Sequence, residues 1–176
     1  MGRGPWLRAG AVFLAACAGF PSARADDTGR LMLGVGQYDI IPDDNKAVAG
    51  YVQYRFAAHL WSTHERGGAF LGFRPIVGAM ANGDEGLFGY VGVAAPFAWD
   101  DWEFELSGGP GAYRRGESTN LGGTFQFHVG AALSRAVGDG LRLGVAMYHI
   151  SNANIHRRNR GTNTLMATLT WSFAGP

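Results

Sequence analysis

Apolar and polar side chains alternate with a period of two along most of the chain beyond residue 26, in short runs. Successive side chains of a β-strand point to opposite faces, so this period predicts strands rather than helices. Gly, Pro, Asn and Asp separate the runs, as is typical of turns. The predicted strands cover residues 30–41, 47–58, 69–81, 87–99, 102–115, 124–137, 141–151 and 163–173.

The number, length and polarity of these strands predict a membrane barrel. A transmembrane β-strand needs about 9–11 tilted residues, and outer-membrane barrels formed by one chain have an even strand number. One face of most runs carries Leu, Val, Phe or Trp. The opposite face carries mainly Gly, Ala, Ser, Thr, Gln, Arg and Tyr, which suits the limited space inside a narrow barrel. We therefore expect an all-β fold, an eight-stranded antiparallel transmembrane β-barrel of the bacterial outer membrane. The alternative is a soluble lipocalin-like barrel, which would turn its apolar face inward.

The first 25 residues have the features of a targeting segment. Arg3 and Arg8 supply positive charge, an apolar stretch follows, and Ala23-Arg24-Ala25 forms an A-x-A cleavage site. This order is typical of a secretory signal peptide, and the apolar stretch is too short to span a membrane as a helix. The alternative is lipoprotein processing at Cys17, the only cysteine. We favour a signal peptide over residues 1–25 and expect residues 26–176 to form the barrel as one domain.

Charge and cysteine content narrow the function further. Residues 1–25 contain three arginines and no acid, so the 15 basic and 14 acidic residues of the chain become 12 and 14 after cleavage. This slightly negative balance gives no support for nucleic-acid binding. His59 and His64 have no carboxylate or cysteine at metal-ligand spacing. We therefore expect neither a metal nor an organic cofactor.

Two polar residues continue the apolar face of the run at residues 141–151. A stripe of leucine, valine and methionine leads along this face into His149 and Ser151. Polar groups are costly in apolar surroundings, so a function explains them better than chance does. If this run pairs with the run at residues 163–173 as a hairpin, Asn163 begins its strand near the place where His149 and Ser151 end theirs. With the N-terminus in the periplasm, the three residues face the outer leaflet, which contains lipopolysaccharide.

His149 and Ser151 have the residue types of a general base and a nucleophile. Residues i and i+2 of a strand point the same way with Cα atoms about 6.5–7 Å apart, so the two side chains could meet. The amide oxygen of Asn163 could accept a hydrogen bond from imidazole Nδ1 and fix the tautomer. An amide does not stabilise an imidazolium as a carboxylate does, so we expect reduced activity. Backbone N–H groups after Ser151, or the Asn152 amide, could bind an oxyanion.

The segment His149-Ile150-Ser151-Asn152-Ala153 resembles the His-x-Ser-Asn-Ala motif of the PagL family, the lipid A 3-O-deacylases of the outer membrane. The resemblance implies an eight-stranded barrel with a Ser-His-Glu triad near its C-terminus and a site open to lipid. It assigns His149 as base, Ser151 as nucleophile and Asn152 as oxyanion residue. The glutamate of the family falls on Asn163. The resemblance is specific to a motif only over about residues 148–173 and otherwise concerns length and strand pattern.

A basic loop follows this motif and contains Arg157, Arg158 and Arg160. Arginine forms paired hydrogen bonds to phosphate, so these residues could bind the phosphates of lipid A, or contact anionic lipopolysaccharide without specificity. The leading hypothesis is a serine esterase that releases an ester-linked 3-hydroxyacyl chain from lipid A. The alternatives are a weak or inactive structural barrel, suggested by the missing carboxylate, and a small porin. Whether the protein forms a homodimer is left open.

Overall fold

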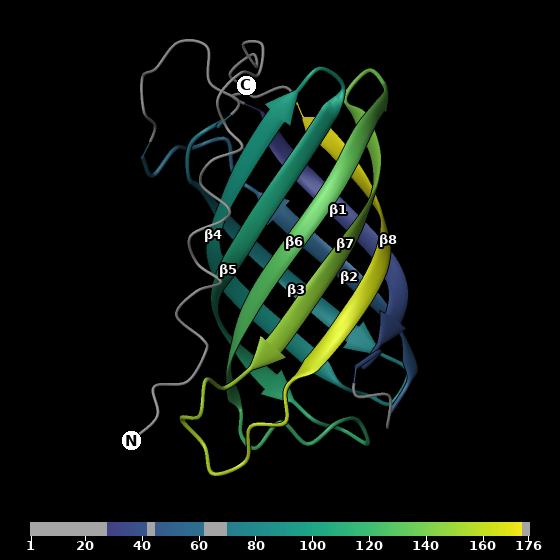
Figure 1. Ribbon diagram of the computed structural model, residues 1–176, viewed down its shortest axis with the longest axis vertical. Helices are drawn as coiled ribbons and strands as arrows, with labels where there is room; N and C mark the ends of the chain where they lie inside the picture. Colours follow the sequence, from purple (N-terminus) through teal and green to yellow (C-terminus); the bar gives the residue numbers. More distant parts are fainter. Residues whose placement is uncertain (1–27, 42–44, 62–69, 174–176) are drawn as a thin grey trace, which may run out of the picture.

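The computed structural model describes residues 28–41, 45–61 and 70–173. They form a closed barrel in which each strand pairs with its neighbours in sequence and the first pairs with the last (Figure 1). The strands are β1 (Gly29–Tyr38), β2 (Ala47–Arg55), β3 (Arg74–Asn82), β4 (Leu87–Trp99), β5 (Trp102–Arg114), β6 (Phe125–Gly138), β7 (Leu141–Ser151) and β8 (Thr162–Phe173). The expected eight-stranded antiparallel barrel is confirmed. The expected signal peptide lies outside the described residues.

Some strands end earlier or begin later than the alternation predicts. The first was expected to reach Ile41 but ends at Tyr38, because Asp39 adopts a φ of 58°. This left-handed conformation is incompatible with a continuing strand. The third was expected from residue 69, but β3 begins at Arg74. The seventh, β7, has the predicted bounds, so the segment with the candidate residues keeps its expected alternation.

The outer surface of the barrel is apolar and the lumen is aromatic and polar. Val35 on β1 and Val129 on β6 are 60% and 58% exposed, as expected for side chains that face lipid. Inside, Tyr90 stacks on His128 with ring centroids 4.2 Å apart, and Tyr148 lies next to them. This polarity is the reverse of that of a soluble lipocalin-like barrel. Among the described residues there is no helix long and apolar enough to cross a membrane.

A buried ion network fills the lumen toward one end. Arg30 Nη1 lies 2.6 Å from Glu103 Oε2, and Arg55 Nη1 lies 2.9 Å from Glu103 Oε1. Arg55 also bonds to Glu105, whose other oxygen accepts a hydrogen bond of 2.8 Å from Gln53 Nε2. These side chains leave a cavity of about 10 Å³, room for about one water molecule. The lumen at this level is packed rather than open, unlike that of a porin.

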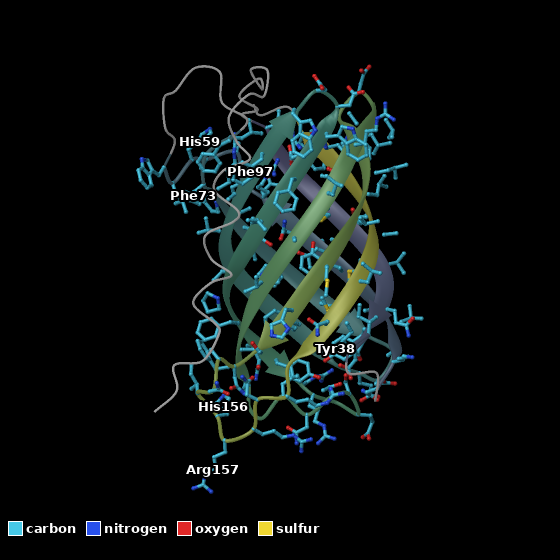
Figure 2. The ribbon with its side chains drawn as sticks, viewed as in Figure 1. Tyr38, His59, Phe73, Phe97, His156 and Arg157 are labelled. Atoms are coloured by element: carbon cyan, nitrogen blue, oxygen red, sulfur yellow. The ribbon has the colours of Figure 1, made fainter. Side chains whose placement is uncertain are left out.

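The two ends of the barrel differ in their connections. The loops after β1, β3, β5 and β7 gather at the lower end of Figure 1. At the upper end β4–β5 and β6–β7 are joined by short turns, whereas the β2–β3 connection is long. Figure 2 shows Phe73 and Phe97 near the upper end, and His156 and Arg157 at the lower end. The predicted site residues therefore lie at the end that carries the β5–β6 and β7–β8 loops.

Candidate functional site

His149 and Ser151 are the last two residues on the outer face of β7. Met147 before them on this face is 42% exposed, whereas Tyr148 and Ile150, which point inward, are each 1% exposed. The pairing register sets His149 opposite Asn163 of β8. The candidate base and its candidate orienting residue are thus cross-strand neighbours on the lipid-facing side, where paired side chains are close enough to interact.

Asn163 is held at both ends of its side-chain amide. His149 Nδ1 lies 3.0 Å from Asn163 Oδ1, and Asn163 Nδ2 donates a hydrogen bond of 2.7 Å to the carbonyl oxygen of Ile41. A backbone carbonyl only accepts, so this second bond directs the amide oxygen toward the imidazole. The proton of a neutral His149 is therefore on Nδ1, and Nε2 has a free lone pair. That tautomer is the one that a base acting on a serine hydroxyl requires.

The segment after β1 also fixes the backbone of Asn163. The amide nitrogen of Ile40 donates a hydrogen bond of 2.9 Å to the carbonyl oxygen of Asn163. Together with the Ile41 bond, this sets both backbone and side chain of Asn163 against residues 40–41. The orientation of His149 therefore depends on a contact between the end of the first strand and the start of the last.

His149 and Ser151 share a face but are not hydrogen-bonded to each other within the described residues. Catalytic hydrogen bonds are often long in substrate-free structures and tighten when substrate binds. Immediately after Ser151 the chain makes a tight turn, in which Ala153 and Asn154 have φ values of 51° and 66°. Non-glycine residues seldom adopt this conformation, and such strain concentrates at functional sites.

Asn152, predicted to bind an oxyanion, is fully buried at 0% exposure. Its Nδ2 donates hydrogen bonds of 2.7 Å to the carbonyl oxygens of Leu121 and Arg158, and its backbone nitrogen donates one of 3.0 Å to Asn159 Oδ1. Every donor of Asn152 is therefore engaged in joining the β5–β6 loop to the β7–β8 loop. Its oxyanion role stays a prediction and requires one of these bonds to exchange for substrate.

The three predicted phosphate-binding arginines do not form one cluster. Arg157 and Arg158 are exposed, and Figure 2 shows Arg157 projecting away from the end of the barrel. Arg160 instead pairs with Asp39, its Nη1 lying 2.9 Å from Oδ2 and 3.1 Å from Oδ1. Two of the three arginines are thus placed to meet a ligand outside the barrel, while the third contributes to the structure of the site.

Asp39 is a residue of the site that the sequence did not single out. It is 0% exposed, and besides Arg160 it accepts hydrogen bonds of 3.1 Å from Thr119 Oγ1 and 3.0 Å from Thr162 Oγ1. Its carboxylate therefore joins the end of β1, the β5–β6 loop and the start of β8. An aspartate at the end of a strand is an ordinary turn residue in sequence, so no local pattern distinguished it.

Gly161 makes room for the imidazole. Its φ is 67°, and a Cβ added there would lie 2.9 Å from Cε1 of His149. Only glycine combines this backbone conformation with so close an approach. Gly161 therefore packs against the ring that Asn163 orients. Among the described residues, no group of three or more His, Cys, Asp or Glu side chains is arranged to hold a metal ion.

Comparisons with known proteins agree with this architecture. A family model described as lipid A 3-O-deacylase (PagL) matches residues 37–172. The crystal structure of the outer membrane enzyme PagL is similar with a TM-score of 0.60 at 16% identity, over 82% of this chain and 99% of that one. A designed transmembrane β-barrel gives 0.58 at 14% identity, over 86% and 99%. Neisserial surface protein A gives 0.51 at 13% identity, over 83% and 96%. No curated protein matches the sequence.

Proposed function

Because the chain belongs to the PagL family of lipid A 3-O-deacylases, we propose that it hydrolyses the ester-linked 3-hydroxyacyl chain of lipid A in the bacterial outer membrane. The observation that supports this most directly is the 3.0 Å contact between His149 Nδ1 and Asn163 Oδ1. It leaves Nε2 of the imidazole available as a base on the lipid-facing side of the barrel, on the face that also carries Ser151. The proposed activity is that of a serine carboxylic ester hydrolase.

In the proposed reaction, Ser151 Oγ attacks the ester carbonyl carbon while His149 Nε2 takes the hydroxyl proton. The tetrahedral intermediate collapses, the bond to the sugar oxygen breaks, and His149 returns the proton to that oxygen. The acyl group is then esterified to Ser151. Water, deprotonated by the same imidazole, releases the 3-hydroxy fatty acid and restores the serine hydroxyl. The role of Asn163 is to hold the ring in the tautomer that both steps require.

The amide of Asn163 limits the rate that we expect. His149 becomes an imidazolium in each tetrahedral transition state, and a carboxylate would stabilise that charge. Hydrogen bonds with an ionised partner are roughly twice as strong as neutral ones. Asn163 supplies the geometry of an orienting residue without its charge, so we propose an enzyme slower than one with a Ser-His-Glu triad.

The surroundings suit a substrate anchored in a bilayer. Met147 on β7 pairs with Leu165 on β8, and both are exposed on the outer face, nearer the middle of the barrel's height than His149. The acyl chains of a lipid that lies against these side chains would run along the outer face of the barrel toward the middle of the membrane. The ester would then lie near the end of the barrel that carries His149. We therefore propose lipopolysaccharide of the outer leaflet as substrate.

The test is mass spectrometry of lipid A from cells that retain the 3-O-acyl chain and express this protein. We expect loss of one 3-hydroxyacyl chain with the wild-type barrel, and intact lipid A with Ser151→Ala or His149→Ala. Each variant must show the heat-dependent electrophoretic shift of a folded outer-membrane barrel. Unchanged lipid A with a folded wild-type protein would refute the proposal.

A second candidate, an inactive structural barrel, is favoured by the single observation that the residue opposite His149 is Asn163, an amide and not a carboxylate. The Asn163→Glu variant distinguishes the two. An inactive scaffold would leave lipid A intact in both forms, whereas a slow enzyme should gain activity or retain it.

A further inference from the structure

A cavity of about 510 Å³ opens at the outer end of β5, beside the loop that joins β5 to β6. It is lined by residues 113–115 and 120–124, none of which belongs to the proposed catalytic group. Arg114 and Arg115 are exposed on its wall, and none of its lining residues, all of them described, is acidic. Neither arginine forms an ion pair with any described residue. The cavity therefore presents two guanidinium groups that have no ion-pair partner among the described residues.

The walls of this cavity are preformed. Arg115 Nε donates a hydrogen bond of 2.9 Å to the carbonyl oxygen of Ser118, which fixes the base of its guanidinium group. The hydroxyl of Tyr113 donates one of 2.9 Å to the carbonyl oxygen of Thr119. These bonds tie the β5–β6 loop to the strand before it, so a ligand meets an ordered surface and loses less free energy in ordering the loop.

The cavity adjoins the loop that follows Ser151. Asn152 donates a hydrogen bond of 2.7 Å to the carbonyl oxygen of Leu121, one of the lining residues. Gly122, the next lining residue, lies so close to the β7–β8 loop that a Cβ there would be 1.9 Å from the carbonyl oxygen of Arg158. The wall of the cavity and the turn after the candidate nucleophile thus form one packed unit.

The register gives the distance from the nucleophile to the cavity. Ser151 pairs with Phe127, and Phe127 pairs with Pro110. Arg114 lies further along β5 toward the outer end, so its Cα is roughly 16 Å from that of Ser151, from two interstrand spacings and the rise along one strand. The outer face between them carries Phe125 and Phe127, whose ring centroids are 5.1 Å apart. Such a separation suits the headgroup of one glycolipid whose ester reaches Ser151.

We infer that this cavity binds a phosphorylated sugar headgroup through Arg114 and Arg115. The guanidinium group matches phosphate oxygens in charge and geometry better than an ammonium group does. Arg157 and Arg158 are exposed on the loop beyond Ser151, and the backbone of Arg158 packs against Gly122 of the cavity wall, so they add positive charge next to the cavity. The inference rests on the proposed function for the identity of the glycolipid, but it does not depend on cleavage.

The experiment measures binding to the full-length Ser151→Ala protein in detergent micelles, so that no turnover occurs. The ligands are bisphosphorylated lipid A, the same lipid after removal of its phosphates, and phosphatidylglycerol. We expect Arg114→Gln to weaken binding of bisphosphorylated lipid A by about tenfold, the effect of one charge-assisted hydrogen bond. Binding of the other two ligands should not change. Arg114→Gln is the cleaner variant, because Arg115 also bonds to Ser118.

The matched control is Arg135→Gln, which removes an exposed arginine next to Asp101 at the opposite end of the barrel. Equal losses in Arg114→Gln and Arg135→Gln, or an equal loss for phosphatidylglycerol, would overturn the inference in favour of general charge attraction. Inorganic phosphate that displaced lipid A at a similar concentration would overturn the headgroup assignment. If Arg114→Gln weakens binding although the wild-type protein cleaves nothing, the cavity assignment stands and the proposed function fails.

In the active protein the same site has a kinetic consequence. A headgroup held equally in the ground state and the transition state lowers KM without changing kcat. Arg114→Gln should therefore raise KM about tenfold and leave kcat unaltered, since its contacts lie far from the reacting atoms. A fall in kcat at constant KM would contradict a binding role.

Discussion

The amide oxygen of Asn163 is the part of the site whose contribution can be measured most cleanly. Replacing Asn163 with Asp keeps an oxygen at the position that lies 3.0 Å from His149 Nδ1, and gives it a negative charge. Replacing it with Ala removes that oxygen. Both variants lose the 2.7 Å hydrogen bond to the Ile41 carbonyl. The ratio of their kcat values therefore measures the group that faces the imidazole, once unfolding data have shown whether repulsion between the second Asp oxygen and the Ile41 carbonyl disturbs the Asp variant.

The structure sets the expected size of this ratio. A hydrogen bond to a charged partner contributes about 1.5–3 kcal/mol, which corresponds to roughly 10- to 150-fold in rate. Asn163 is only partly buried and lies at the very start of β8, at the end of the barrel where hydrated lipid headgroups screen the charge of an Asp, so the lower part of that range applies. Asn163→Ala should lower kcat relative to wild type by about two- to tenfold, the value of a neutral hydrogen bond.

The assay is deacylation of lipid A by the purified barrel in micelles, followed by mass spectrometry at saturating substrate. Unfolding in urea, measured in parallel, separates a loss of stability at the Ile41 contact from a change in chemistry. A kcat ratio near one between folded Asn163→Asp and Asn163→Ala would refute the view that residue 163 acts through the imidazole.

Three further predictions concern the surroundings of the site and the lumen. Gly161→Ala should lower kcat by at least about tenfold, because the new Cβ would lie 2.9 Å from His149 Cε1 and the backbone conformation would be strained. The measurement is kcat of the folded fraction of the variant. Asp39→Ala removes the buried carboxylate that bonds to Arg160, Thr119 and Thr162, and should lower the free energy of unfolding by about 3 kcal/mol, measured by urea titration in lipid vesicles. Glu103 links two lumen arginines, so the wild-type barrel should give no conductance steps in planar bilayers.

The strand faces could be predicted from the sequence because the pleat of a strand has a period of two. That period, together with the prediction that the apolar face meets lipid, placed His149 and Ser151 on the outer face, and antiparallel pairing then set Asn163 opposite His149. The end of the first strand could not be predicted, because the left-handed conformation of Asp39 depends on partners distant in sequence.

Contacts to backbone atoms were also hidden from the sequence. Asn152 bonds to two carbonyl oxygens, and a carbonyl has no residue-specific pattern that could reveal it as a partner. For the same reason the contact of Asn163 with Ile41 could not be foreseen. Arg160 looked like its neighbours in a basic loop, although its partner Asp39 is 121 residues away. The basic composition of the loop therefore could not show that Arg160 is paired within the barrel while Arg157 and Arg158 are exposed.

The contact of Asn163 with residues 40–41 spans the seam between β1 and β8, where the cylinder shuts. A polypeptide that is still crossing the periplasm has the same sequence motif, but its β1 and β8 have not yet paired. Its imidazole then lacks the tether that selects a tautomer. In the proposed enzyme the catalytic group is therefore complete only once β1 and β8 have paired, so hydrolysis is confined to protein that is already embedded next to its lipid.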